Sequence, residues 1–245
     1  MNRPWPARVW AALREWGQPL LFALMVTQFG ASAVQVDGAS MMPALRHGEW
    51  LAVEKAGGWA HRLGAGGYAR GDIVVFKPPR GAPVAWSNVY RGLGLPWRYR
   101  PFLVKRVVGV PGDRVSLRGG VVRVNGRVLP EAARTFWAGH CLDTFSPQAN
   151  RVAPGPDAPP QPEVTVPPGH YYLLGDNRSP GGSLDSRSFG PVPVGDLAGR
   201  AVLSVWPVVR PAQATPPCDG LPQPEQRVRL SGETELSPRW LLGAP

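Results

Sequence analysis

The longest apolar stretch of the chain covers residues 19–36 and carries no charged residue. Its 18 residues are at the lower end of the length that spans a membrane as a helix. Arg3, Arg8 and Arg14 precede it, and positive flanks stay on the cytoplasmic side. The pattern therefore predicts a cytoplasmic N-terminus and a single membrane anchor in residues 1–36, with the rest of the chain on the extracytoplasmic side of the cytoplasmic (inner) membrane.

The end of this stretch has a second possible interpretation. The small residues at 31–33 resemble the end of a cleavable signal peptide. Hydrophobicity resumes at Val34 and Val36, however, and the most promising chemical motif follows at once. We therefore favour an anchor that stays on the chain.

After residue 36 the apolar positions come in short runs between turns, as in β-strands. Strands are predicted at residues 49–54, 70–77, 102–110 and 114–129, the last broken by a turn at Asn125 and Gly126. A glycine-rich loop is predicted at residues 57–67. The sequence thus predicts a mainly β protein, with an all-β catalytic body at residues 37–210 and a C-terminal tail at 211–245.

Two insertions rich in Pro and Gly interrupt this body. Residues 80–101 place aromatic side chains among prolines and arginines, a mixture suited to a membrane interface. Packing within a hairpin is the weaker alternative, and stacking on nucleic-acid bases is weaker still. Residues 146–168 are dominated by proline and contain too few apolar residues for a core of their own.

Composition narrows the candidate chemistry. A formal charge of +10 on 245 residues suits anionic lipid as well as nucleic acid, and beside an anchor we expect lipid and no nucleic acid. Cys141 and Cys218 lack metal-type spacing and the four histidines form no cluster, so no metal or cofactor is expected. The two cysteines could form one disulfide or remain two thiols.

Ser40 is the candidate nucleophile. It lies in V-Q-V-D-G-A-S-M-M-P-A-L, residues 34–45, directly after the apolar stretch. A serine in such turn-prone sequence usually caps a turn, so a catalytic role requires a base elsewhere in the chain. The G-x-S-x-G signature of many serine hydrolases is absent, and no histidine is singled out by its surroundings.

Lysine is the other possible base, and the chain has only Lys55, Lys77 and Lys105. Lys105 alone is embedded in a strand of Phe, Leu and Val. Desolvation there would lower its pKa and allow it to accept a proton near neutral pH. The alternative is an outward-facing strand residue, since Lys105 and its strand neighbours alternate in direction.

A polar loop at residues 173–192 favours a catalytic role for Ser40 and Lys105. It reads L-L-G-D-N-R-S-P-G-G-S-L-D-S-R-S-F-G-P-V, in which glycines allow tight turns between many hydrogen-bonding side chains. This density of polar groups exceeds what a solvated turn needs.

Four segments in this order make the chain resemble the bacterial type I signal peptidases, or leader peptidases, which use a Ser/Lys dyad. The residues at 40–45 are similar to the family's S-M-x-P-T-L motif, and those at 70–76 to its R-G-D-I-V-V-F motif. The lysine motif resembles residues 105–115, and G-D-N-R-x-x-S-x-D-S-R-x-x-G-x-V resembles residues 175–192. The resemblance covers residues 34–206.

This resemblance implies roles for individual residues. Ser40 would be the nucleophile and would supply a backbone N–H to the oxyanion hole. Lys105 would be the general base, and Ser183 would orient its amine. The supporting and cleft residues would be the Asp185–Arg187 ion pair, Gly38 near the oxyanion hole, and Met41 and Met42 along the substrate cleft.

The chain departs from the family pattern in three places. Gly38 occupies the position of a serine that is a second oxyanion donor in some relatives, so this donor is not identified. Ala44 replaces the usual Thr. The last motif is two residues longer than usual, which leaves Ser179 as a rival to Ser183.

The expected function is a membrane-anchored serine endopeptidase that removes signal peptides from secreted preproteins after small residues in an A-x-A pattern. A specialised processing peptidase of a pilin or conjugation system is the alternative with the same chemistry. A relative of self-cleaving repressors would need a DNA-binding domain in place of the apolar run. An inactive membrane-tethered scaffold is the alternative from another class.

Overall fold

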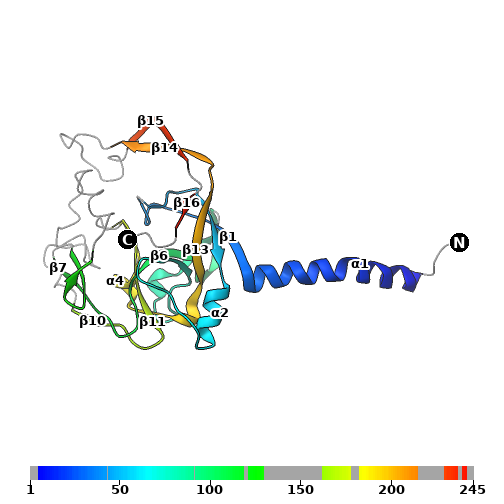
Figure 1. Ribbon diagram of the computed structural model, residues 1–245, viewed down its shortest axis with the longest axis horizontal. Coiled ribbons are helices and arrows are strands. Elements are labelled where there is room, and N and C mark those ends of the chain that lie inside the picture. Colours follow the sequence, from blue (N-terminus) through cyan, green and yellow to red (C-terminus); the bar gives the residue numbers. More distant parts are fainter. Residues whose placement is uncertain are drawn as a thin grey trace.

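The computed structural model describes residues 5–42, 44–90, 92–118, 121–129, 162–177, 182–214, 229–236 and 239–241. Both cysteines, Ser179 and most of the Pro-rich insertion at 146–168 lie outside these ranges. The body is mainly β, as predicted, and a curled sheet forms its centre (Figure 1).

The central sheet has eight strands in the order β1-β2-β13-β3-β6-β11-β12, with β16 paired to β13. Its described strands pair antiparallel throughout. Its strands are β1 (Ala31–Gln35), β2 (Trp50–Glu54), β3 (Ile73–Phe76), β6 (Leu103–Gly109), β11 (His170–Leu174), β12 (Val192–Pro193), β13 (Leu197–Trp206) and β16 (Arg239–Trp240). The strands predicted at residues 49–54, 70–77 and 102–110 are thus confirmed as β2, β3 and β6.

A smaller sheet has the order β10-β7-β8-β9, from β7 (Arg114–Arg118), β8 (Val121–Val124), β9 (Arg127–Val128) and β10 (Val164–Thr165). Asn125 and Gly126 both have positive φ, at 53° and 79°, which is the backbone that a two-residue hairpin turn requires. The turn predicted there is confirmed.

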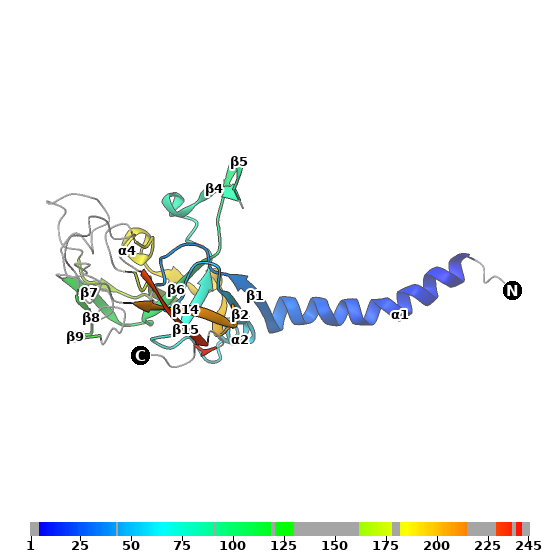
Figure 2. The ribbon, with the colours of Figure 1, turned by 90° about the horizontal axis from the view of Figure 1, so that it is seen from above.

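Two hairpins complete the strands. In β4 (Ser87–Tyr90) and β5 (Leu93–Tyr99), the aromatic insertion forms a pair that projects from the body (Figure 2). A short 3-10 turn, η2 (Pro83–Ala85), precedes it. The second hairpin joins β14 (Val209–Ala214) to β15 (Arg229–Leu236), within the stretch predicted to be a loop and tail.

The N-terminal prediction needs correction. Helix α1 (Trp5–Met25) extends away from the body and contains Pro19 in its interior (Figure 1). A π-helical turn, η1 (Val26–Gly30), follows, and then β1. Residues 19–36 are therefore not one helix, because β2 supplies the backbone partners of β1 from Ala31 to Gln35. Among the residues that the structure describes, none of the helices combines the length and the apolar character that a membrane crossing requires.

Two other predicted boundaries also shift. The glycine-rich stretch at 57–67 begins as helix α2 (Ala56–Arg62), where the Glu54 carboxylate accepts a hydrogen bond from the Gly57 N–H. Two further single turns, α4 (Ser186–Phe189) and η4 (Val194–Asp196), follow β11. In the stretch predicted as a C-terminal tail, β16 joins the central sheet.

Three buried apolar clusters hold these layers together. The first lies under the loop that carries Ser40 and contains Val36, Met41, Leu45, Leu51 and Leu241, among others. The second packs β3, β6 and β11 with β13, and the third joins β6 and β11 to the small sheet. The core is therefore continuous with the segments that hold the candidate site.

Candidate active site

Ser40 sits in a tight loop between β1 and β2. We call residues 36–49 the Ser40 loop. Its base is closed by hydrogen bonds from Val36 N to Glu49 O, at 2.8 Å, and from Gly48 N to Val36 O, at 2.9 Å. Inside the loop, Met42 N donates to Ala39 O at 3.1 Å. The chain thus turns sharply at the serine, whose position is set by the two flanking strands.

Lys105 lies in the middle of β6, opposite Val74 of β3. Its side chain is buried, with a residue exposure of 3%. Burial lowers the pKa of Lys105 to about 8, although the negative charges of Asp185 and Asp176 oppose this effect. The expectation of a desolvated lysine is borne out by this position, and the alternative of an outward-facing residue is not.

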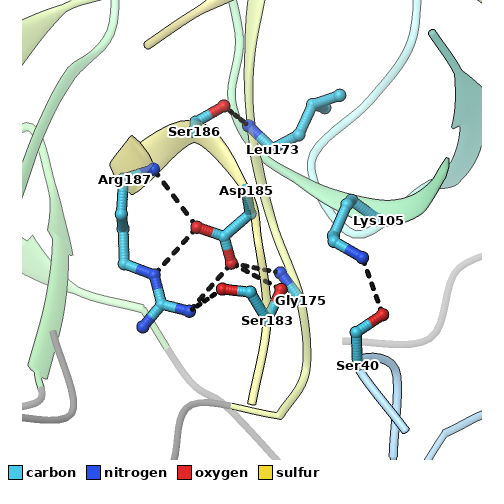
Figure 3. Close-up of polar contacts among 8 residues, drawn as sticks. All are labelled: Ser40, Lys105, Leu173, Gly175, Ser183, Asp185, Ser186 and Arg187. Atoms are coloured by element: carbon cyan, nitrogen blue, oxygen red, sulfur yellow. Dashed lines mark hydrogen bonds and ion pairs between the residues drawn. The ribbon is translucent and has the colours of Figure 1, made fainter. Parts of the chain in front are cut away.

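The two candidate catalytic groups meet directly. Lys105 Nζ lies 2.7 Å from Ser40 Oγ (Figure 3). The same Nζ lies 2.9 Å from the carbonyl oxygen of Val104. A neutral amine in this place donates one N–H to Val104 O and directs its lone pair at the serine hydroxyl. This geometry can deprotonate Ser40 without a histidine.

The polar loop after β11 is organised around the buried carboxylate of Asp185 (Figure 3). Arg187 binds both of its oxygens, with Nε at 2.8 Å from Oδ1 and Nη2 at 2.9 Å from Oδ2. Ser183 Oγ and Gly175 N also donate to Oδ2, at 2.8 and 3.0 Å. Burial would raise the pKa of Asp185, but Arg187 and the hydrogen bonds outweigh it and hold the pKa low. The ion pair expected here is present.

Ser183 was expected to orient the amine of Lys105, but it does not hydrogen-bond to that amine. Its hydroxyl donates to Asp185, and within the described part of the site no hydrogen bond joins it to Lys105 (Figure 3). A Cβ on Gly175 would lie 2.2 Å from Ser183 Oγ and 2.5 Å from the Ser40 carbonyl oxygen. Ser183 therefore packs, across Gly175, against the backbone of the nucleophile.

Asn177 is a residue whose role the sequence did not reveal. Its backbone N–H donates to Ser40 O at 3.0 Å, and its side-chain amide donates to Ala39 O at 3.2 Å. The G-D-N motif thereby fastens the loop after β11 to the Ser40 loop. Position in the motif was the only available signal, because this contact joins segments far apart in the sequence.

Arg106 binds the neighbouring residue of that motif. It forms a bidentate pair with Asp176, at 2.8 and 2.7 Å, and donates to Gly71 O at 2.8 Å. This bridges β6, the loop before β3 and the loop after β11. These contacts give Arg106 a structural role.

Gly38 is used for its backbone. Its φ is +86°, in the left-handed region that favours glycine, and its N–H donates to His47 Nδ1 at 3.1 Å. That N–H is thus engaged within the Ser40 loop. By contrast, the Ser40 N–H has no hydrogen-bond acceptor among the described residues, which leaves it available to a substrate oxygen.

The two residues predicted to line the substrate cleft, Met41 and Met42, differ in burial. Met41 is 1% exposed and packs in the first core cluster with Leu45 and Leu51, so it does not line a cleft; this prediction is wrong. Its side chain points inward because the turn at Ser40 directs it beneath the loop. Met42 is half-buried, in keeping with a place at the edge of the site.

A groove of about 890 Å³ runs beside β1. It is lined by the stretch from Ser32 to Asp37, by Trp50, Val53 and Ala198 from neighbouring strands, and by the segment that holds Tyr99, Pro101 and Phe102. The first and last of these segments end a few residues before Ser40 and Lys105 in the sequence. In the described ranges, no three His, Cys, Asp or Glu side chains converge in a way that could hold a metal ion.

A family model and comparisons with individual relatives identify the same protein family. The family model "Signal peptidase, peptidase S26" matches residues 9–206. Signal peptidase I of Leptolyngbya laminosa is 31% identical over 201 residues, covering 82% of this chain and 81% of that protein. Signal peptidase IB of Staphylococcus aureus (strain COL) is 31% identical over 183 residues, covering 75% and 82%.

A crystal structure of a signal peptidase I from Enterococcus faecalis V583 is 27% identical and covers 55% of this chain and 96% of that one, with a TM-score of 0.33. The family model spans most of the chain, from α1 to the end of β13. The chain therefore belongs to the signal peptidase family, peptidase S26, and is a serine endopeptidase.

Proposed function

We propose that this protein removes signal peptides from secreted preproteins by a Ser/Lys dyad, with Ser40 as nucleophile and Lys105 as general base. The observation that carries the proposal is the 2.7 Å distance between Ser40 Oγ and a lysine amine that is buried in the core. Burial keeps part of the amine neutral near pH 8, and only the neutral amine can accept the serine proton.

The reaction follows from this geometry. Ser40 Oγ attacks the carbonyl carbon of the scissile bond while its proton passes to Lys105 Nζ. The resulting ammonium protonates the leaving amine, and an acyl-enzyme remains on Ser40. Lys105 then takes a proton from a water molecule as the water attacks the ester. The lysine returns this proton to Ser40 Oγ as the acyl–oxygen bond breaks and the product leaves. The unoccupied Ser40 N–H would stabilise the oxyanion, at about 3 kcal/mol for one donor.

The substrate would bind along β1. This strand is at the edge of the central sheet and pairs with β2 on one side only within the described residues. An extended peptide could add to its other edge, inside the groove, and lead into Ser40. Small residues such as Ala33, Ala198 and Ser32 line this groove, and shallow pockets between them would suit the A-x-A pattern.

Membrane attachment is part of the same proposal. The apolar side chains of α1 are exposed, with Leu20 at 66% and Phe22 at 70%. The β4–β5 hairpin exposes Leu93 and Trp97 at 68% and 62%. We propose that both surfaces contact anionic lipid of the cytoplasmic membrane, with the catalytic body on the extracytoplasmic side. The function requires this side, since exported preproteins are cleaved there.

The cleavage proposal is tested with the full chain in detergent and a preprotein whose signal peptide ends in A-x-A. Mass spectrometry of the products should show a single cut after the second Ala. Replacing that Ala by Trp in the substrate should abolish the cut, since the groove beside β1 has only shallow pockets. A cut elsewhere, or indifference to the Trp, would contradict the proposed specificity.

Topology needs its own experiment. In inverted membrane vesicles the body faces the lumen if the proposal is right, so added protease should digest only a short N-terminal piece. Detergent should then expose the rest as a control for intrinsic resistance. Digestion of the body in sealed inverted vesicles would place it in the cytoplasm and refute the proposed orientation.

A further inference from the structure

The C-terminal strand β16 lies beyond the region matched by the family model, which ends at residue 206. It pairs with β13 through Ser204 opposite Arg239 and Leu203 opposite Trp240 (Figure 1). Leu241 N then donates to Val202 O at 2.9 Å. A segment distant in sequence is thus fixed against the central sheet, on the strand next to β2.

Arg239 reaches from this strand to the Ser40 loop. Its Nη2 donates to the carbonyl oxygen of Ala44 and lies 3.4 Å from Glu49 Oε2. Both partners belong to the second half of the loop, between the nucleophile and β2. One guanidinium nitrogen, Nη2, therefore bridges two points of the loop.

Glu49 makes this contact more than a surface ion pair. Its side chain is 2% exposed. Oε1 accepts from Arg46 N at 3.2 Å, and Oε2 accepts from Ser204 Oγ at 3.0 Å. Arg239 supplies a positive charge to this carboxylate. The carboxylate in turn ties the backbone of the loop to β13.

Packing acts on the same part of the loop. Leu241 is buried in the first core cluster beside Met41 and Leu45. Met41 follows the nucleophile directly, and Leu45 N donates to Met41 O at 2.9 Å. Asn177 holds the loop on one side of Ser40, and the C-terminal segment holds it on the other.

We propose that Arg239 is a positioning residue for the nucleophile: by binding Ala44 O and Glu49, it holds the Ser40 loop in the conformation that places Ser40 Oγ against Lys105 Nζ. This inference rests on the proposed dyad function. It predicts that catalysis depends on a C-terminal residue outside the matched family region.

The test compares R239Q, R239K and the double variant E49Q/R239Q with the wild-type full chain in detergent. The matched control is R123Q, because Arg123 is exposed on β8 of the small sheet, away from the site. For each protein, kcat and KM are measured on a peptide substrate at pH 8, together with the midpoint of thermal unfolding.

R239Q should lower kcat by about 10- to 100-fold, the scale of a small displacement of a reacting group, with KM within about twofold of wild type. R239K should recover part of kcat. The double variant should regain thermal stability, because the charges of both partners are removed together, while kcat stays low because Ala44 O still lacks its donor. R123Q should match wild type.

Two results would overturn the positioning role. One is a kcat for R239Q within twofold of wild type. The other is a double variant in which kcat returns together with the unfolding midpoint, since Arg239 would then act through stability alone.

A measurement independent of cleavage separates this proposal from the dyad. Amide hydrogen exchange over residues 41–49 should be faster in R239Q and in the double variant than in wild type and R123Q. If S40A cleaves as well as wild type, the dyad fails, but faster exchange would still support the tether. Unchanged exchange would refute the tether even if the dyad holds.

Discussion

Lys105 can act as a base only because of where its strand places it. Its amine is buried, and desolvation lowers its pKa to about 8. Asp185 and Asp176 are close enough to raise that pKa, and Arg187 partly cancels them. The acid–base balance of the site is therefore set by the polar loop after β11 as well as by burial.

The first prediction concerns the pH dependence of cleavage. Under the proposed dyad mechanism the neutral form of Lys105 is the active one, so kcat/KM should rise about tenfold per pH unit below pH 8 and level off above it. A stopped assay on a peptide substrate from pH 6 to pH 10 measures this profile. A flat profile across pH 7 to pH 9 would argue against a titrating lysine.

The same shift makes a prediction about stability. The unfolded chain binds the lysine proton more tightly, with a pKa near 10.5, so wild-type stability should rise as the pH increases from about 8 to about 10.5. K105M has no such proton, so at pH 7 its free energy of unfolding should be about 2 kcal/mol higher than that of the wild type. The advantage should shrink above pH 8. Urea titrations at pH 7 and pH 10 would measure the stability difference between K105M and wild type. A difference of the same size at both pH values would contradict the prediction.

Gly175 gives a prediction about the backbone of the nucleophile. The Cβ of G175A would lie 2.5 Å from Ser40 O, so the nucleophile or the loop after β11 must move. We expect kcat to fall by about 100-fold, and stability by about 1–3 kcal/mol. The control is G195A, because nothing lies within 4 Å of a Cβ at Gly195. A fully active G175A would show that Ser40 does not depend on this close contact.

Residue by residue, the sequence was informative where the chemistry has a strong local signature. Ser40 and Lys105 could be singled out, because one follows the apolar stretch in a turn and the other interrupts an apolar strand. The contact of Ser183 with Asp185 and the burial of Met41 could not, because each depends on segments brought together by the fold. Arg239 was overlooked for the same reason.

At the level of elements, short apolar runs between turns predicted β2, β3, β6 and the strands β7, β8 and β9 correctly, whereas β10 lies in the stretch predicted to be a Pro-rich insertion. The prediction failed at residues 19–36, where an apolar run does not distinguish a membrane helix from a strand at the sheet edge. In β1 the side chains of Ser32 and Val34 are more buried than their neighbours, an alternation hidden by small residues. The edge strand and its groove therefore emerged only from the structure.

The groove beside β1 gives a prediction for substrate binding. Ala198 lines it from β13. A198L would fill part of the space that a small substrate side chain is proposed to occupy, so KM should rise about tenfold while kcat changes little. Steady-state kinetics with an A-x-A peptide would measure both, and thermal unfolding would verify that the sheet is intact. An unchanged KM would place the substrate elsewhere.

For the molecule as a whole, exposed apolar side chains occur on α1 and on the β4–β5 hairpin, in a chain with a charge of +10. Figure 2 shows the hairpin projecting from the body. L93S/W97S should therefore weaken binding to anionic lipid vesicles roughly tenfold, through lost apolar contact. V128S, which changes an exposed valine on the small sheet, is the control. Equal vesicle binding by all three proteins in a flotation assay would exclude the hairpin as a lipid contact.

The most direct test of the dyad is a double-mutant comparison of S40A, K105A and S40A/K105A in the preprotein cleavage assay. Because the two residues act as one unit, each single variant should lose at least about 1000-fold in kcat, and the double variant should be no worse than either. Thermal unfolding would establish that all three are folded. Wild-type processing by either single variant would contradict the assignment of Ser40 and Lys105 as nucleophile and base.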